Sequence, residues 1–297
     1  MSMTHEANGN GPVVTHVIAA SGGENGSAVA PRGVVPLAAS VIGPVAPGHV
    51  IPSVSLIIPT KNEASNVSWV LEQVPSVVTE IVIVDGHSSD ATIVTARSSR
   101  NDVKVVTQEG MGKGDALRKG FAEATGEILV MIDADGSMNP QEITHFLHFL
   151  DNGYDFVKGS RFTGGGGSRD ITRMRRMGNM AFRQMVNVLF DAQLTDLCYG
   201  YCAFHRRYLP FLNLRTSGFE VETALVISAL RAGLRIAEVP SMEMPRRHGR
   251  SNLRTFRDGS RVLNTIIREH RSRNVVLPGR GLPALPAADP ARADHLA

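Results

Sequence analysis

The stretch GMGKGDALRKGFAEATGEILVMIDADGSMNP (residues 110–140) decides the fold. A glycine-rich turn opens it, and helical spacing then puts Ala116, Leu117 and Phe121 on one face. An apolar run, EILVMID (127–133), follows directly. A short run of this kind is typical of a strand whose two faces are both covered. Helix and strand in succession predict one unit of a parallel α/β sheet.

The same alternation runs through the first half of the chain. Further apolar runs predict strands over 54–59, 80–85, 103–108 and 155–160, with helices between them, of which the first opens at Asn62 and runs through Leu71. Such alternation forms right-handed βαβ units, so we predict one α/β domain with a mostly parallel, Rossmann-like sheet flanked by helices. After residue 160 the pattern predicts a flexible glycine loop (160–170), helices over 174–190, 220–230 and 253–269, and strands over 201–204 and 234–239.

Composition limits the class of protein. Hydrophobic residues make up 42% and charged residues 20% of the 297 residues, as in globular proteins. Two cysteines, Cys198 and Cys202, exclude a disulfide scaffold and a four-cysteine zinc site. No apolar run has the roughly 18–20 residues of a membrane span, and no signal peptide is evident, so we expect a cytoplasmic protein. Residues 1–52 and 274–297 are predicted to be flexible tails around a folded body over 53–273, since both are rich in small residues and proline and lack aromatics.

Acidic residues mark the candidate site. Ligands of an open α/β sheet bind beyond the carboxyl ends of its strands. Asp133 and Asp135, on either side of Ala134, follow a predicted buried strand, and Asp85 ends a second strand. Two carboxylates that point the same way repel unless a cation lies between them, and Mg²⁺ or Mn²⁺ favours carboxylates together with substrate phosphates. Alone, the triplet is more often a solvated turn. Its place opposite Asp85 predicts a site for a metal and a phosphate.

The glycine-rich turn GMGKG (110–114) has two interpretations. It could cradle a phosphate at the start of a helix. Alternatively, it is a tight turn before a helix, with Lys113 an ordinary residue of the first helical turn. The spacing of a Walker A loop is absent.

Several motifs in a fixed order resemble one enzyme family. PTKNE (59–63), VDGHSSDAT (84–92), the stretch 110–140 and FEVETALVISALRAGLRIAEVP (219–240) are similar to family 2 glycosyltransferases of the GT-A fold. The branch they resemble is that of the dolichyl- or polyprenyl-phosphate mannosyltransferases. The resemblance covers about residues 54–252. It implies a nucleotide-sugar-binding half over 53–160 and an acceptor half over 161–273 with a basic C-terminal helix.

The resemblance also implies roles for individual residues. The nucleotide pocket would be lined by Pro59, Thr60, Asn62 and Glu63, Asp85 would bind the base, and Lys113 would lie near the nucleotide. Asp133, Ala134 and Asp135 would hold the ribose and the metal-bound diphosphate.

Three departures from the family pattern bear on these roles. Ser137 stands where relatives often have a metal-binding glutamine, and His248 is either a substitute metal ligand or a surface histidine. The C-terminal membrane helices of some relatives are absent. A Glu-Asp pair of the acceptor site is also missing, and Asp196 is the nearest acidic residue to that place.

The mechanism depends on the acceptor. The family relationship implies inversion, with the metal at Asp135 stabilising the leaving diphosphate. A hydroxyl acceptor needs a general base, for which Asp196, Glu220 and Glu222 are candidates. A monophosphate, with a second pKa near ~6, is already a nucleophile at neutral pH and needs cations instead.

Arginines favour the phosphate acceptor. The segment 161–183 contains six arginines and one acid, and 246–273 contains nine arginines and two acids. We predict that Arg161, Arg175, Arg247 and Ser251 bind the acceptor phosphate. At the last helix five arginines share a stripe, which either rests on anionic lipid headgroups or is a solvated face over a core side that includes Phe256. They are Arg250, Arg254, Arg257, Arg261 and Arg268. Met177, Met180, Met185 and Phe190 form either a lipid path or a core stripe.

The sequence thus predicts a glycosyltransferase that uses Mg²⁺ or Mn²⁺ and moves a sugar from a UDP- or GDP-sugar to a polyprenyl phosphate. It would lie at the inner face of the plasma membrane by peripheral contact with anionic lipid. The alternative acceptor is a soluble hydroxyl compound, either a phosphorylated small molecule or a natural-product aglycone. A nucleotidyltransferase is disfavoured because PTKNE is not the expected loop after the first strand. A non-catalytic basic adaptor would not need Asp85, Asp133 and Asp135 together, and nucleic acid is not expected as a partner, given the net charge of +3.

Overall fold

The computed structural model describes residues 35–36, 52–249, 251 and 253–272. Nearly all of both predicted tails lies outside these residues. The exception is a two-residue strand, β1 (Val35–Pro36), which pairs in parallel with Ala237 and Glu238 of β9 (Ile236–Pro240).

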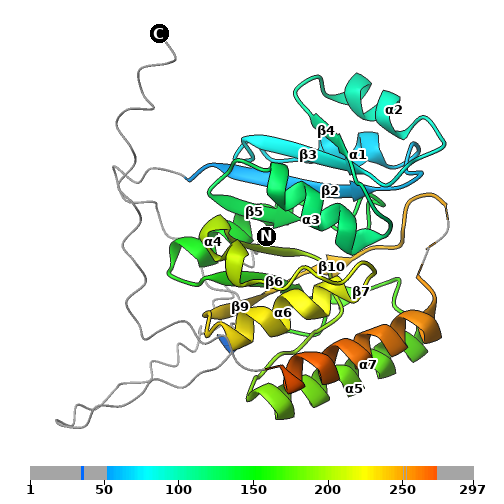
Figure 1. Ribbon diagram of the computed structural model, residues 1–297. Coiled ribbons are helices and arrows are strands. Elements are labelled where there is room, and N and C mark those ends of the chain that lie inside the picture. The colour runs from blue at the N-terminus through cyan, green and yellow to red at the C-terminus, as the bar shows by residue number, and fades with distance from the viewer. Residues whose placement is uncertain (1–34, 37–51, 250, 252, 273–297) are drawn as a thin grey trace, which may run out of the picture. The chain divides into compact units, whose positions relative to one another are not determined.

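An eight-stranded sheet forms the centre of the structure, in the order β1-β9-β6-β8-β5-β2-β3-β4 (Figure 1). All neighbouring strands are parallel except β8, which is antiparallel to both β5 and β6. The mostly parallel sheet predicted from the apolar runs is therefore confirmed. Its other strands are β2 (Val54–Thr60), β3 (Glu80–Asp85), β4 (Lys104–Thr107), β5 (Ile128–Met131), β6 (Phe156–Ser160) and β8 (Cys202–His205).

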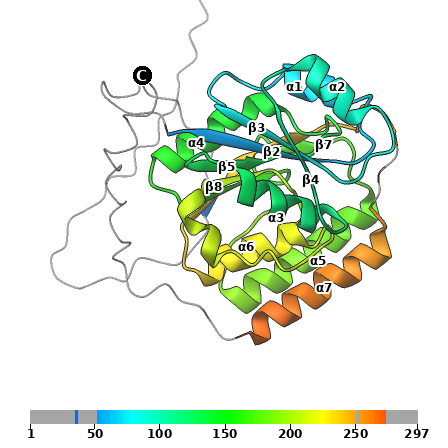
Figure 2. The same cartoon turned by 45° about the horizontal axis from the view of Figure 1, so that its top comes forward.

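Helices cover both faces of the sheet, and alternation along each strand separates two hydrophobic clusters. In β2, Ile57 faces one cluster while Leu56 and Ile58 face the other. Figure 2 shows together the helices that cover the face of the sheet to which Ile57 points. The Ile57 face is covered by α3 (Lys113–Glu123), α5 (Arg173–Phe190), α6 (Val221–Arg231) and α7 (Thr255–Arg271), and the opposite face by α1 (Val67–Glu72), α2 (Thr92–Ser99) and α4 (Ile143–Asp151).

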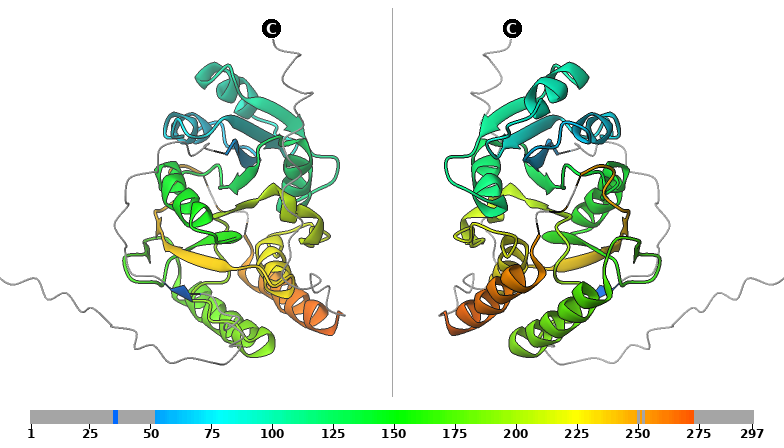
Figure 3. Two further views of the ribbon diagram at one scale, coloured as in Figure 1. Left: turned by 90° about the vertical axis from the view of Figure 1, so that its left-hand side faces the viewer. Right: turned by 90° about the vertical axis from the view of Figure 1, so that its right-hand side faces the viewer.

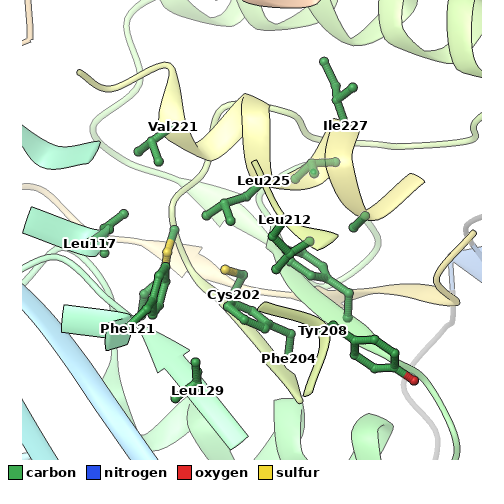
Figure 4. Packing of buried hydrophobic residues seen from close by; sticks show 14 of the residues in the cluster. Leu117, Phe121, Leu129, Cys202, Phe204, Tyr208, Leu212, Val221, Leu225 and Ile227 are labelled. Atoms are coloured by element: carbon green, nitrogen blue, oxygen red, sulfur yellow. The ribbon is translucent and has the colours of Figure 1, made fainter. Parts of the chain in front are cut away.

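The cluster on the Ile57 face joins the two ends of the sheet. Phe121 of α3 meets the ring of Phe204 on β8 edge-on, with ring centres 5.4 Å apart, and Phe204 stacks on Phe156 of β6 at 5.5 Å. Leu225 of α6 points into the same cluster (Figure 4). The antiparallel strand β8 is thus fixed by packing as well as by its hydrogen bonds to both neighbours.

Two segments differ from the sequence prediction. The first helix begins at Val67 rather than Asn62, because Asn62 has a left-handed φ of 57° and binds the loop after β3. The glycine loop after β6 contains regular structure that its composition does not predict. There β7 (Gly167–Ser168) pairs in parallel with β10 (Met242–Glu243). Two short 3₁₀ helices, η1 (Pro140–Glu142) and η2 (Arg206–Phe211), complete the described elements.

Helix α3 lies unusually close to the sheet at Gly120. A Cβ atom at this position would be 2.5 Å from Cγ2 of Ile57 and 2.8 Å from Cγ2 of Val84. Real Cβ atoms do not come this close to a neighbour, so α3 or the side chains of Ile57 and Val84 would have to move. The glycine therefore sets the distance between α3 and the strands that carry the candidate site.

We expect Gly120→Ala to lower the free energy of unfolding by about 1–3 kcal/mol, the usual cost of overpacking a core. A loss of stability would be informative because, without a clash, replacing glycine by alanine in a helix interior stabilises it by roughly 0.5–1 kcal/mol. Urea denaturation measures the change. The control is Gly178→Ala in α5, where an added Cβ meets no atom within 4 Å and should not destabilise the fold. Equal stability of the two variants would contradict the close packing at Gly120.

Candidate active site

A cavity of about 1080 Å³ lies beyond the carboxyl ends of β2, β3 and β5 and continues between α5 and α7. Pockets for single drug-sized ligands span roughly 300–1,000 Å³, so this cavity has room for more than one small ligand. Asp133, Ala134 and Asp135 line it, as predicted from the strand ends. Residues of the loop before α6 and of the first turns of α5 and α7 also line the cavity.

A buried lysine joins two carboxylates in the cavity wall. Lys113 Nζ lies 2.5 Å from Asp133 Oδ1 and 2.6 Å from Glu222 Oε1. Burial opposes the lysine charge, but the two carboxylates raise the pKa of Lys113 above its ordinary value. Burial, together with Asp135 and Glu222, raises the pKa of Asp133 to about 6, against the opposing effect of Lys113. Negative charge is thus concentrated at this point beyond what one lysine neutralises.

Arg246 reaches the second aspartate from the loop before α7. Its guanidinium group binds the Glu63 carboxylate with both Nη atoms at 2.8 Å, and its Nε lies 3.6 Å from Asp135 Oδ2. Burial opposes the charge, but Glu63 and Asp135 raise the pKa of Arg246. Asp135 Oδ1 accepts a hydrogen bond from the Ser137 amide at 3.0 Å. The sequence prediction named Arg247 instead of Arg246, and this is wrong for the cavity. Arg247 is exposed, stacks on Trp69 at 4.5 Å and does not line the cavity.

The carboxylate pair fits a hard divalent cation in its chemistry, since Mg²⁺ and Mn²⁺ take a few carboxylates and complete their shell with phosphate oxygens and water. The residues that fit are Asp133 and Asp135, which the structure places side by side in the cavity wall. The predicted third ligand does not join them. Within the described part of the chain no three His, Cys, Asp or Glu side chains are grouped to hold a metal, and His248 is exposed outside the cavity.

The predicted nucleotide-binding residues divide into two groups. Pro59, Thr60 and Glu63 line the cavity, together with Lys113 and the Asp133–Asp135 triplet. Asn62 and Asp85 do not; they fix the loops around it. Asp85 accepts hydrogen bonds from the Ser88 amide at 3.2 and 3.3 Å, and Asn62 Oδ1 accepts one from the Ser89 amide at 2.8 Å.

The glycine-rich turn serves packing against a neighbouring loop. The Gly114 amide donates to the carbonyl of Ser217 at 2.9 Å, and Cβ atoms at Gly112 or Gly114 would clash with the backbone of Thr216 and Ser217. Gly112 also has a φ of 94°, which side chains rarely adopt. The structure therefore explains these glycines by the tight turn before α3. No phosphate is needed to account for them.

Arg161 and Asp196, predicted for the acceptor phosphate and for catalysis, form a buried pair, and of the two only Arg161 lines the cavity. Arg161 Nε and Nη2 bind the two oxygens of Asp196 at 2.7 and 3.0 Å, Nη2 also binds the Cys198 carbonyl, and Nη1 binds Glu243. All five N–H donors are occupied, so Arg161 has none left for an acceptor phosphate. Asp196 is fully buried outside the cavity lining and cannot act there as a general base.

Of the two remaining candidates for a general base, one lines the cavity and the other does not. Glu220 is buried, does not line the cavity, and accepts a hydrogen bond from the Gly218 amide at 3.2 Å. Its prediction as a catalytic residue is therefore not supported by its position. Glu222 does line the cavity but is bound to Lys113.

The cations available in the cavity lie at the starts of two helices. Arg175 and Ser251 line the cavity as predicted. Arg254 and Arg257, predicted for a basic stripe of the last helix, line it as well, and Arg250 of the same predicted stripe lies outside the described residues. Arg175, Arg254 and Arg257 form no ion pair with another residue of the described chain. Arg254 and Arg257 are three residues apart at the start of a predicted helix that follows a loop of polar residues. This spacing was the sequence signal that could have placed them at the site.

An α/β sheet with paired carboxylates at a strand end, beside a large cavity with unpaired arginines, has the chemical groups that a site for phosphate-bearing ligands requires. The model of the family "Glycosyl transferase family 2" matches residues 55–210, more than half of the chain, and the chain belongs to this family. It is a glycosyltransferase, as the motifs predicted.

Its relatives include enzymes that act on lipid phosphates. A dolichyl-phosphate hexose transferase of Haloferax volcanii is 29% identical over 217 residues, covering 72% of this chain and 92% of that protein. An undecaprenyl-phosphate mannosyltransferase of Micrococcus luteus is 29% identical over 222 residues, covering 70% and 90%. A dolichol-phosphate mannosyltransferase of Pyrococcus furiosus is 28% identical over 210 residues, which are 68% of this chain and 59% of that protein.

A solved structure supports the fold. Glucosyl-3-phosphoglycerate synthase from Mycobacterium tuberculosis, in complex with Mn²⁺, uridine diphosphate and phosphoglyceric acid, superposes with a TM-score of 0.61 at 24% identity. The match covers 78% of this chain and 86% of that chain. The GT-A-like arrangement expected from the motifs is thereby confirmed.

We expect Asp196→Asn to lower the free energy of unfolding by about 3–5 kcal/mol, because it leaves a buried guanidinium without its partner. Burial alone would raise the pKa of Asp196, but Arg161 holds it below its ordinary value. The stabilisation is therefore complete above the unfolded pKa of about 3.9 and is lost as the pH falls through the lower folded pKa. Urea denaturation at several pH values measures both effects.

The control is Asp102→Asn, which removes an exposed partner of Arg100 and should cost less than about 1 kcal/mol. If the two variants lost the same stability, or if Asp196→Asn were destabilising to the same extent in acid, the Arg161–Asp196 pair would not have the importance that its burial indicates.

Proposed function

We propose that this glycosyltransferase moves a sugar, with inversion, from a nucleoside-diphosphate sugar to the phosphate of a polyprenyl phosphate. The observation that carries the proposal is the continuity of one cavity. The carboxylates after β5 line it, and so do unpaired arginines and apolar side chains of α5 and α7. A sugar nucleotide and an amphipathic phosphate each match one of these two sets of groups. The relatives that are named for dolichyl- and undecaprenyl-phosphate support the acceptor class.

For the donor, Asp133 and Asp135 are the residues to hold Mg²⁺ or Mn²⁺. When bound, the ion supplies charge neutralisation at the leaving diphosphate. Lys113 keeps Asp133 in place and adds a fixed positive charge next to it. Pro59 and Thr60 form the wall for the nucleotide, and Asp85 organises the adjacent loop.

In the transfer step, an oxygen of the lipid phosphate attacks the anomeric carbon. A bond forms from that oxygen to carbon, the bond from carbon to the diphosphate oxygen breaks, and the nucleoside diphosphate leaves with the electron pair. A phosphate with a second pKa near ~6 needs no general base, in agreement with the burial of Asp196 and Glu220. Arg175, Arg254, Arg257 and Ser251 are the groups proposed to bind it.

The alternative acceptor is a soluble phosphorylated compound with a reacting hydroxyl. The fold neighbour crystallised with phosphoglyceric acid makes this worth testing. Such an acceptor needs a general base, and of the three candidates only Glu222 lines the cavity. It would also leave the apolar walls of α5 and α7 in contact with water.

The outer surfaces of α5 and α7 fit peripheral contact with an anionic membrane. Among the described residues no helix is long and apolar enough to cross a bilayer. Helix α5 has no acidic residue, and the two acids of α7, Asp258 and Glu269, are buried. Exposed apolar side chains accompany the arginines, including Met177 and Phe256, the latter predicted for the core. Figure 3 shows these helices at the end of the sheet away from α1 and α2.

We expect calorimetry to show that UDP or GDP binds in the presence of Mn²⁺ and that Asp135→Asn abolishes the metal-dependent part of this affinity. The variant removes a charge that a hard cation requires. The control is Asp191→Asn at the end of α5, where asparagine suits the left-handed φ of 50° and the side chain does not line the cavity of the candidate site. Absence of binding of both nucleotides to the wild type would refute the donor site.

We also expect the protein to sediment with vesicles that contain phosphatidylglycerol, and less with pure phosphatidylcholine or at high salt. The double variant Met177→Ser and Val188→Ser should weaken this binding, since it removes apolar side chains that are 66% and 71% exposed. Val94→Ser is the matched control on α2, where the valine is 69% exposed. Equal losses in both variants would argue against a membrane face formed by α5.

A further inference from the structure

Helices α5 and α7 run side by side in the same direction. The ring of Phe182 lies next to Gly259, and further along Phe190 meets His270 edge-on with ring centres 5.8 Å apart. Both pairs advance together along the two helices, so the helices are parallel, and Figure 1 shows them adjacent. Their first turns therefore both lie at the cavity, which explains why Arg175, Arg254 and Arg257 face the same space.

Each of the two helices has a glycine in its interior where the cavity continues between them. An added Cβ at Gly178 would meet no atom within 4 Å, and at Gly259 it would only touch the ring of Phe182 at 3.9 Å. Neither glycine has a positive φ. Glycine weakens a helix interior compared with alanine. Since neither packing nor backbone conformation requires these two glycines, their effect is to leave the wall of the cavity open.

The unpaired arginines line the cavity at the helix starts, and further apolar side chains line it beyond the two glycines. Gly178 follows Arg175 by three residues and Gly259 follows Arg257 by two, which places the glycines about 3–4.5 Å further along the helix axes. Beyond them Phe182, Val262 and Leu263 line the cavity, and Arg261, which lines it too, lies 3.7 Å from the buried carboxylate of Asp258. A ligand with a phosphate at the helix starts would thus extend any attached chain along these apolar side chains, where the only lining cation already has a partner among the described residues.

We propose that the space between α5 and α7 is a groove for the first isoprene units of the acceptor, and that Gly178 and Gly259 are the residues that admit the chain. This inference rests on the proposed polyprenyl-phosphate function. The occupant follows from the two properties of the cavity, because unpaired arginines match a phosphate and the adjoining apolar walls match a hydrocarbon. A compact soluble phosphate would occupy only the cationic part.

The test compares two phosphates with the same charged group, methyl phosphate and citronellyl phosphate, by calorimetry in the presence of the nucleoside diphosphate. The wild type is expected to bind citronellyl phosphate at least about tenfold more tightly, which corresponds to the burial of about two methylene groups. Gly178→Leu and Gly259→Leu fill the groove and should reduce this ratio towards one. Affinity for methyl phosphate and for the nucleotide should not change.

Controls separate the groove from other effects. Gln184→Leu adds the same side chain on an exposed position of α5 outside the cavity and should leave the ratio at its wild-type value. Gly178→Ala fits the available space without a clash, so it should fold normally and lower the ratio in part, even if a leucine variant does not fold.

The outcomes distinguish the groove from the function on which it rests. A wild type that binds the nucleotide but neither phosphate would overturn the polyprenyl-phosphate acceptor and the groove together. A high wild-type ratio that all the glycine substitutions leave unchanged would place the chain elsewhere and overturn the groove alone. A ratio near one in the wild type would have the same meaning, provided that undecaprenyl phosphate still accepts the sugar.

Discussion

A chain of buried charges holds the centre of the structure together. Lys158 Nζ donates to the Asp196 carbonyl at 2.7 Å and lies 3.7 Å from Glu238, whose carboxylate accepts hydrogen bonds from the amides of Thr195 and Asp196. The Asp196 side chain in turn binds Arg161. Buried ions of this kind are tolerated only when each has its partner. The segment 195–200 is therefore fixed, and its residues Cys198, Tyr199 and Gly200 form part of the cavity wall.

The geometry of the cavity follows from this fixed segment. Strand β8 continues directly from it and inserts between β5 and β6, antiparallel to both. The carboxylates after β5 and the loop after β6 are thus brought to one side of the sheet. The loop after β6 is tied down in turn, since Glu243 of β10 binds Arg161 and also Ser168 of β7. Helix α5 begins a few residues later, at a place that these contacts determine.

Much of the fold could be predicted because apolar patterning is a local property. The runs 54–59 and 127–133 became β2 and β5, and Asp133 and Asp135 took their places at the predicted strand end. Partners of charged residues could not be predicted, because they are distant in sequence. Glu63 meets Arg246 across 183 residues. Arg161 was predicted to bind a phosphate because the sequence shows its positive charge. The sequence does not show that Asp196, 35 residues away, binds its guanidinium group. For the same reason sequence alone did not distinguish Arg246 from Arg247.

Strand β8 also has a consequence for how the enzyme can change. The parallel strands β5-β2-β3-β4 and β6-β9-β1 share no hydrogen bonds with each other, because β8 separates them. Substitutions in α5 and α7 therefore reach the strand ends that carry the aspartates through side-chain contacts rather than through neighbouring strands. These contacts include the shared hydrophobic cluster on the Ile57 face, the Lys113–Glu222 ion pair and the Arg246–Glu63 contact. A change in the α5–α7 layer can accordingly alter the shape of the cavity without displacing the aspartates only where it keeps these contacts.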